Sequence, residues 1–243
     1  MEKAIEVENL HIRYRSINPV SLRKGIRKGT GKRVNNHEAV KGISFSIEQG
    51  EIVGIIGENG SGKSTLLLSI ASIFSPDQGT VNTFNRSVSL LAIGVGFQKV
   101  LTGRENIMLS GLLLGFTKKQ IEEKMPEIID FSELGHFIDK PVKTYSSGMY
   151  SKLAFAITAI LETDIVLIDE VLSVGDAKFK KKSFNKMKNL IMDEKRTVLI
   201  VSHSIDTLRS LCHRVIWMHR GELKMVGESG MVLDEYLQFM NSL

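Results

Sequence analysis

The amino-acid sequence predicts an α/β fold with a largely parallel β-sheet. Three apolar runs are interpreted as buried strands because each ends abruptly in polar, glycine or acidic residues: 51–57, 164–170 and 197–203. Apolar residues at helical spacing follow the first run, at Leu66, Ile70 and Ile73, and also follow the third. Alternating strands and helices are typical of this fold class, in which ligands bind beyond the carboxyl ends of the strands. We therefore expect a site at the polar strand ends.

Two segments depart from this alternation. Near the N-terminus, period-two patterns predict one strand before and one strand after a basic stretch, residues 16–37, which we interpret as an insertion. Between residues 98 and 161 the strand signal is absent, and Thr117 with Gln120 forms a capping box ahead of an apolar helical face. The expected organisation is a single domain over 1–243, with a core of 1–97 and 162–243 and an inserted helical subdomain, 98–161.

Length and composition indicate an ordinary soluble globular chain. The 243 residues are 42% hydrophobic and 24% charged, and no apolar stretch reaches the roughly 18 residues that a membrane-spanning helix needs. The first residues lack the basic start and apolar block of a signal peptide, so we expect the protein to stay in the cytoplasm. A lone cysteine, Cys212, offers neither an internal disulfide nor a zinc site, and we expect it to pack as a small hydrophobe.

The excess positive charge is concentrated in one segment. The net charge is +5, and residues 23–33 contain repeated Lys and Arg with no acidic residue. Such a run can face the phosphates of lipid or of nucleic acid, and a solvated loop without a partner is an equally good interpretation.

A glycine-rich loop carries the first chemical signal. Residues 57–65, GENGSGKST, fit the pattern G-x-x-x-x-G-K-[ST] and lie between a predicted strand and a predicted helix, which is the context that gives the pattern meaning. The glycines let backbone N–H groups turn around phosphate oxygens, Lys63 adds a positive charge at the β and γ phosphates, and Ser64 is a candidate Mg²⁺ ligand. The candidate phosphate-binding residues are Gly57, Glu58, Asn59, Gly60, Ser61, Gly62, Lys63, Ser64 and Thr65.

The ends of the other two predicted strands add two acids and a histidine. Asp169 can hold Mg²⁺ through its carboxylate or through the water shell of the metal. Glu170 follows at once, and because consecutive strand residues point to opposite sides, it can face a water molecule that attacks the γ-phosphate. His203 is placed to hydrogen-bond that phosphate or the attacking water. Surface acids after a core strand and a structural histidine are the alternative interpretations.

Together these motifs resemble those of the nucleotide-binding subunit of an ABC transporter, over essentially the whole chain. The resemblance implies a P-loop NTPase (RecA-like) core, an N-terminal antiparallel β-subdomain, a helical signature subdomain, and hydrolysis of ATP with Mg²⁺. It also implies a head-to-tail homodimer, in which the signature segment of one copy closes over the ATP of the other; a simple helix N-cap is the alternative. The residues that match the signature are Tyr145, Ser146, Ser147, Gly148 and Met149.

Three further site residues follow by similarity alone. Gln98 resembles the glutamine that senses Mg²⁺ and the γ-phosphate, although a solvated loop glutamine would look the same. Asp176 resembles the acidic residue that crosses the dimer interface, in the loop after the catalytic glutamate. Tyr14 resembles the aromatic residue that stacks on adenine, and a strand-edge tyrosine is nearly as good an interpretation. The implied catalytic set is Lys63, Gln98, Glu170 and His203, and the implied metal set is Ser64, Gln98 and Asp169.

Two departures from the common pattern narrow the expected function. YSSGM in place of the usual LSGGQ, and VLSVGD after Glu170, resemble the ATPases that export cell-surface polysaccharides such as teichoic acid, O-antigen and capsule. The resemblance implies an ATPase subunit on the cytoplasmic face of the cell membrane, with two copies of a separate transmembrane permease and a lipid-linked polysaccharide as substrate. We expect no nucleic acid partner. Another ABC transporter ATPase, or an ABC-type clamp acting on DNA or ribosomes, is the alternative.

Overall fold

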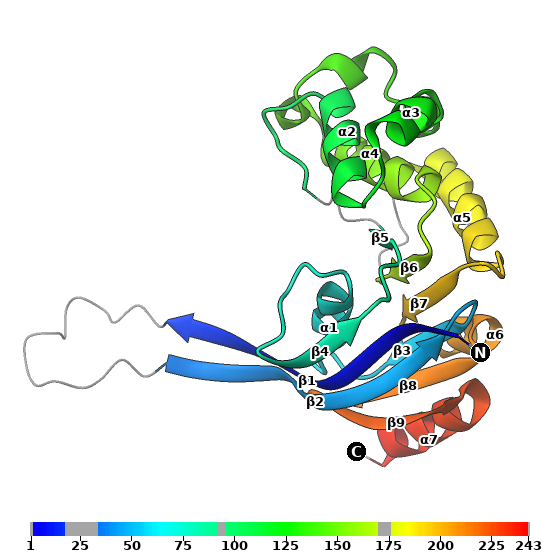
Figure 1. Cartoon of the computed structure of the whole chain (residues 1–243). Coiled ribbons are helices and arrows are strands. Elements are labelled where there is room, and N and C mark those ends of the chain that lie inside the picture. The colour runs from blue at the N-terminus through cyan, green and yellow to red at the C-terminus, as the bar shows by residue number, and fades with distance from the viewer. Residues whose placement is uncertain (1, 18–33, 92–95, 170–175, 243) are drawn as a thin grey trace, which may run out of the picture.

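The protein folds into two β-sheets and a helical subdomain that stands apart from them (Figure 1). The computed structural model describes residues 2–17, 34–91, 96–169 and 176–242.

The larger sheet carries the strand ends at which the sequence predicts a site. Within the described residues its strand order is β5-β6-β7-β3-β8-β9, and all neighbouring pairs are parallel except β8 with β9. The strands are β3, Ile52–Ile56; β5, Val88–Leu91; β6, Ile165–Ile168; β7, Thr197–Val201; β8, Arg214–His219; and β9, Glu222–Glu228. The three predicted runs correspond to β3, β6 and β7, which are direct neighbours, so their carboxyl ends meet at one edge. The predicted α/β class is confirmed.

The smaller sheet is antiparallel and packs against the larger one. In the described part of the chain its strand order is β2-β1-β4, with β1 at Lys3–Ile17, β2 at Val34–Glu48 and β4 at Gln78–Asn82. The pairing of β1 with β2 continues as far as Ile17 with Val34. Regular strand therefore extends into the predicted insertion, 16–37, from both sides. The rest of that segment, 18–33, which includes the basic run, lies outside the described residues.

Helices cover the larger sheet and form the separate subdomain. The α-helices are α1, Lys63–Ile70; α2, Gly103–Leu113; α3, Lys118–Ser132; α4, Ser147–Ile160; α5, Ala177–Ile191; α6, Ile205–Leu211; and α7, Ser229–Asn241, with 3₁₀ helices at Gly135–Asp139 and Val142–Thr144. The predicted capping box of Thr117 and Gln120 begins α3. The expected apolar face after β3 is shorter than predicted, because α1 ends at Ile70 and Ile73 is 42% exposed. Among the described helices, none has both the length and the apolar composition to cross a bilayer.

Three apolar clusters hold these layers together. Consecutive strand residues such as Ile55 and Ile56 point to opposite faces of the larger sheet, and both are at most 1% exposed. One face packs on the smaller sheet and α1, and the other packs on α4, α5, α6 and α7. The helical subdomain has a cluster of its own, which includes Ile107, Ile121 and Leu153. The sequences of β3, β6 and β7 are unbroken apolar runs because this part of the sheet is buried on both faces.

Candidate nucleotide-binding site

The loop between β3 and α1 forms a cradle of backbone groups. Gly62 is the N-cap of α1 with φ 101°, a left-handed conformation, and no side chain caps the helix there. A Cβ atom on Gly62 would collide with the carbonyl oxygen of Ala39, and one on Gly57 would collide with that of Met218. The first N–H groups of α1 therefore remain available to a ligand, and a helix N-terminus favours an anion.

Lys63 is the buried cation of this cradle. The residue is 6% exposed, and its Nζ donates to the carbonyl oxygens of Gly57 at 2.8 Å and Glu58 at 2.9 Å. Burial lowers the pKa of Lys63, and the negative charge of Asp169 opposes that shift. Since carbonyl dipoles only partly replace the hydration of an ammonium group, a phosphate is a better partner for it.

The ends of β6 and β7 complete the same pocket. Asp169 and His203 line a cavity of about 170 Å³ together with the loop and the start of α1. Burial and the positive charge of Lys63 lower the pKa of His203, against an opposing effect of Asp169. The neutral imidazole is therefore favoured near pH 7. The predicted loop residues that line the cavity are Asn59, Gly60, Gly62, Lys63, Ser64 and Thr65.

Two loop residues turn their side chains away from this cavity. Ser61 is 2% exposed, and its Oγ has no hydrogen-bond partner within the described residues. The carboxylate of Glu58 lies 3.2 Å from Nδ1 of His219, at the end of β8. Glu58 and Ser61 do not line the cradle cavity, and their role in phosphate binding stays a prediction.

Tyr14 lies beside the cradle although it comes from β1. Its hydroxyl shares a hydrogen bond of 3.1 Å with Oγ1 of Thr65 on α1. The ring packs edge-on against Phe74, with centroids 5.9 Å apart, and the residue is 40% exposed. The geometry supports adenine stacking by Tyr14, which stays a prediction.

Gln98 is held through its main chain by a buried asparagine. Its N–H donates to Oδ1 of Asn106 at 2.7 Å, and Nδ2 of Asn106 donates to the carbonyl oxygens of Gln98, Leu101 and Thr102. Gln98 is exposed and does not line the cradle cavity, so its role toward Mg²⁺ stays a prediction. Asn106 was not predicted as a functional residue; the signal that could have identified it is an amide side chain in the first turn of a helix that Thr102 caps.

The YSSGM segment opens α4 at a second pocket. Ser146 is the N-cap, and its Oγ accepts a hydrogen bond from the N–H of Met149 at 3.2 Å. Residues 146–149 line a cavity of about 520 Å³ together with Lys152 and Asp176. Among the described residues, none lines both this cavity and the cradle cavity. Within one copy, the signature and the phosphate loop are therefore separate sites, on α4 and α1 respectively (Figure 1).

Two residues of the signature are anchored in the helical subdomain. The hydroxyl of Tyr145 donates to the carbonyl oxygen of Phe137 at 2.8 Å, and burial raises the pKa of Tyr145. Tyr145 and Met149 both pack against the apolar cluster of that subdomain. Of the other three signature residues, Ser146 and Ser147 are exposed, and nucleotide contact by residues 145–149 stays a prediction.

Asp176 is engaged within its own chain. Its carboxylate caps α5 by accepting the N–H of Phe179 at 3.0 Å, and it forms an ion pair of 2.8 Å with Lys152. These two hydrogen bonds, with that of Lys152 the stronger, lower the pKa of Asp176 to about 2. The predicted position of Asp176 at the dimer interface therefore has to allow its cap on α5 and its ion pair with Lys152. Glu170, the predicted catalytic carboxylate, lies outside the described residues.

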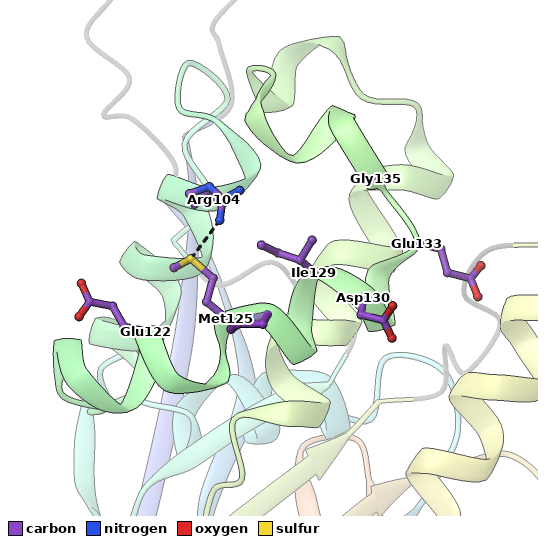
Figure 2. A pocket seen from close by; sticks show the side chains of 8 residues that line it. Arg104, Glu122, Met125, Ile129, Asp130, Glu133 and Gly135 are labelled. Atoms are coloured by element: carbon purple, nitrogen blue, oxygen red, sulfur yellow. Dashed lines mark hydrogen bonds between the residues drawn. The ribbon is translucent and has the colours of Figure 1, made fainter.

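A larger cavity, of about 790 Å³, lies on the helical subdomain and contains no phosphate-binding motif. Arg104, Met125 and Ile129 line it, and Arg104 contacts the sulfur of Met125 at 3.6 Å (Figure 2). Size alone therefore does not identify the nucleotide site, and the residue types around the cradle do.

Comparison with known proteins agrees with the geometry of the cradle. Residues 40–173 match the ABC transporter family. This chain belongs to that family. The match includes the phosphate loop, the signature, and β6 with the Asp169 that follows it, whereas Tyr14, Asp176 and His203 lie outside the matched residues.

Curated ABC relatives align with most of the chain. The teichoic acids export ATP-binding protein TagH of Bacillus anthracis is 48% identical over 204 residues, which are 84% of this chain and 37% of the relative. The O-antigen export system ATP-binding protein RfbB of Myxococcus xanthus is 47% identical over 82% of this chain and 45% of the relative. For RfbB of Klebsiella pneumoniae the identity is 44%, over 83% of this chain and 82% of the relative. The chain spans less than half of the first two relatives and most of the third.

Solved ABC structures share the fold. A dimeric ATP-binding cassette bound to ADP and Pi in a post-hydrolysis state has a TM-score of 0.68 at 22% identity, over 93% of this chain and 98% of the other. An ATP binding subunit of an ABC transporter has a TM-score of 0.70 at 19% identity, over 96% and 93%. The predicted P-loop NTPase core is thereby confirmed at the level of the fold.

Proposed function

We propose that this chain is the ATP-hydrolysing subunit of an exporter of lipid-linked cell-surface polysaccharide, either teichoic acid or O-antigen. The observation that carries the proposal is that Lys63, Asp169 and His203 converge on the glycine-rich loop in one cavity. A buried cation, a helix N-terminus with available N–H groups and a carboxylate at a strand end suit a magnesium triphosphate better than an uncharged ligand.

Each group of the cradle has a task in ATP hydrolysis. The N–H groups of the loop and the ammonium of Lys63 bind the β and γ phosphates and stabilise the charge that develops as the γ-phosphate leaves. Neutral His203 hydrogen-bonds the γ-phosphate or the attacking water, and Glu170 faces that water. The hydroxyl of Ser64 and the carboxylate of Asp169 are oxygen donors of the kind Mg²⁺ prefers, and they would hold that ion, which supplies charge neutralisation at the phosphates.

A second copy of the chain completes the site. The N–H groups at the start of α4 suit an anion, yet the cavity they line is separate from the cradle of the same copy. A head-to-tail dimer would bring residues 146–148 of one copy to the phosphates held by the other. A cassette that shares this fold has been solved as a dimer bound to ADP and Pi.

The exported substrate is proposed from the relatives. TagH and RfbB are named as ATP-binding proteins of teichoic acid and O-antigen export, and they are 43–48% identical to this chain. By this similarity the chain works at the cytoplasmic face of the membrane with two copies of a separate permease. Binding of ATP closes the dimer, hydrolysis opens it, and the permease converts this movement into transport.

Phosphate release and nucleotide binding by the purified protein test the chemistry. Lys63→Ala should abolish binding of Mg-ATP, whereas Lys188→Ala, an exposed lysine on α5, should bind and hydrolyse ATP as the parent does. Glu170→Gln should keep binding and accumulate as an ATP-loaded dimer. A parent protein that neither binds nor hydrolyses Mg-ATP would contradict the proposal, as would undiminished turnover by Glu170→Gln.

Reconstitution tests the substrate. The protein is placed in proteoliposomes with a candidate permease and with lipid-linked teichoic acid or lipid-linked O-antigen, and polymer transfer is measured. ATP-dependent transfer of one polymer class supports the proposal. ATP hydrolysis without transfer of either class, in proteoliposomes whose permease binds the ATPase, would refute the export assignment and leave the ATPase assignment standing.

A further inference from the structure

Lys152 joins three helices next to the signature. It lies on α4, a few residues after the 146–148 segment, and its side chain is 14% exposed. Its Nζ lies 2.8 Å from Oδ2 of Asp176 at the start of α5 and 3.5 Å from Oε2 of Glu133 at the end of α3. Figure 2 shows Glu133 pointing away from Arg104 and toward α5. One ammonium group therefore links α3, α4 and α5.

A second lysine extends this link into a row of alternating charges. Nζ of Lys182, on α5, donates to Oε1 of Glu133 at 3.3 Å and to the carbonyl oxygen of Phe131 at 3.0 Å. We call Asp176, Lys152, Glu133 and Lys182 the tie cluster. Isolated surface ion pairs contribute little, but a partly buried network with shared partners holds its geometry better.

Aromatic rings contact both ammonium groups of the tie cluster. Nζ of Lys152 lies 4.9 Å from the centroid of Phe179, and Nζ of Lys182 lies 4.5 Å from that of Phe131, both within cation–π range. Phe155 of α4 packs against both rings, with centroids 6.1 Å from Phe131 and 6.3 Å from Phe179, and the latter two rings contact each other at 5.7 Å. Both ammonium groups are thus fixed by acids on one side and by rings on the other.

The tie cluster connects the starts of α4 and α5, whose relative position matters for the proposed ATPase. The helix that carries Lys152 begins with the signature residues 146–148, and the helix that Asp176 caps begins seven residues after Glu170. We propose that Lys152 is a positioning residue, which holds the start of α4 at a set orientation to the start of α5. The inference rests on the proposed function, because it assigns to Lys152 the alignment of the signature of one copy with the catalytic loop of the same copy.

Steady-state kinetics separate positioning from direct ligand contact. Lys152→Met should lower kcat by about tenfold or more, because small displacements of a catalytic segment are costly, and should leave KM for ATP within about twofold. Lys152→Arg, which can bridge the same two acids, should restore most of kcat. Lys188→Met is the matched control and should equal the parent. A rise in KM with kcat unchanged would show that Lys152 contacts the nucleotide itself and would overturn the proposal.

A double-mutant cycle tests the named partner. Asp176→Asn should reproduce part of the loss in kcat, and combining it with Lys152→Met should add little, because both changes break the same contact. Additive losses would overturn the proposal. Urea unfolding of each variant checks that it is folded, and Glu133→Gln, which removes only the longer ion pairs, serves as a milder variant with a smaller loss in kcat.

Amide hydrogen exchange distinguishes failure of this inference from failure of the proposed function. If the parent protein shows no ATP turnover that depends on Lys63, the proposed function fails and the tie cluster is judged on exchange alone. In Lys152→Met, amides at 147–151 and at 177–180 should exchange faster than in the parent and in Lys188→Met. Unchanged exchange in both segments would overturn the role of Lys152.

Discussion

Replacing Asn106 with alanine tests how the loop that contains Gln98 is held. Asn106 is 0% exposed, and its side chain accepts the N–H of Gln98 at 2.7 Å. Its amide nitrogen donates to the carbonyl oxygens of Gln98, Leu101 and Thr102, at 3.1, 3.2 and 2.8 Å. One buried amide therefore connects the start of α2 to the loop that leads into the helical subdomain.

The expected loss of stability depends on which hydrogen bonds each partner of Asn106 keeps after the substitution. The three carbonyl oxygens also accept main-chain N–H groups, those of Leu101, Val142 and Asn106 itself, at 2.9 to 3.1 Å, so they stay partnered in Asn106→Ala. The N–H of Gln98 loses the acceptor described here, at about 1–3 kcal/mol, and the lost side-chain donor contributes about 1 kcal/mol more. Alanine returns about 0.5 kcal/mol of helix propensity. We expect the free energy of unfolding to fall by about 1.5–3.5 kcal/mol, the sum of these estimates.

Urea unfolding followed by circular dichroism measures this loss, and hydrogen exchange of the Gln98 amide locates it. Asn189→Ala, at an exposed position on α5, is the control and should change stability by no more than about 0.5 kcal/mol. If Asn106→Ala loses less than about 1 kcal/mol and the Gln98 amide exchanges at the parent rate, the loop is not held by Asn106 and the reasoning is wrong.

Further predictions concern the cradle, the signature and the core. Gly62→Ala forces a Cβ against the carbonyl of Ala39 at φ 101°, so it should lose nucleotide binding and about 1–3 kcal/mol of stability, as measured by ligand titration and urea unfolding. Ser146→Ala removes the N-cap of α4 and should cost about 1 kcal/mol in the same unfolding assay. Burial lowers the pKa of His203, so between its folded pKa and about 6.5 the unfolded state binds more protons than the folded state. The free energy of unfolding should therefore fall as the pH falls through that window, and His203→Gln should flatten this dependence. A pKa of His203 above 6.5, measured by NMR in the folded protein, would contradict the prediction. Burial raises the pKa of the Cys212 thiol to about 12, so a thiol reagent at pH 8 should react only on unfolding, and rapid labelling of the native protein would contradict the buried placement.

Local pattern was sufficient for the strands that carry the site. The runs that became β3, β6 and β7 were predictable because both faces of these strands are buried, which leaves an unbroken apolar stretch. The strands β4, β5, β8 and β9 were not predicted from the sequence; in β9 every residue is exposed or half-buried, which gives a weaker signal. The sequence analysis also extended the apolar face after β3 to Ile73, which lies beyond the end of α1. Ile73 shows that an apolar residue at the right spacing can still be solvent-facing.

In the candidate site, too, some features were predictable from the sequence and others only from the structure. The phosphate loop was predictable because its geometry depends on neighbouring residues, and the structure places Lys63, Asp169 and His203 around one cavity. Tyr145 and Met149 were predicted as members of the signature segment, and only the structure shows that their side chains pack on the helical subdomain. The resemblance named the pattern as a block, and it could not tell which members face a ligand.

By itself the sequence determined the chemistry of this protein: the glycine-rich loop, the acids and histidine at strand ends, and the helix that begins with Ser146 are all local features within a few residues. Only the tertiary structure decided which groups are already engaged, such as Asp176 with Lys152, 24 positions apart in the chain, and Tyr14 with Thr65, 51 apart. The physical reason is that helix and strand periodicity determines the direction of a side chain on its own element, while the partner it meets depends on how the elements pack.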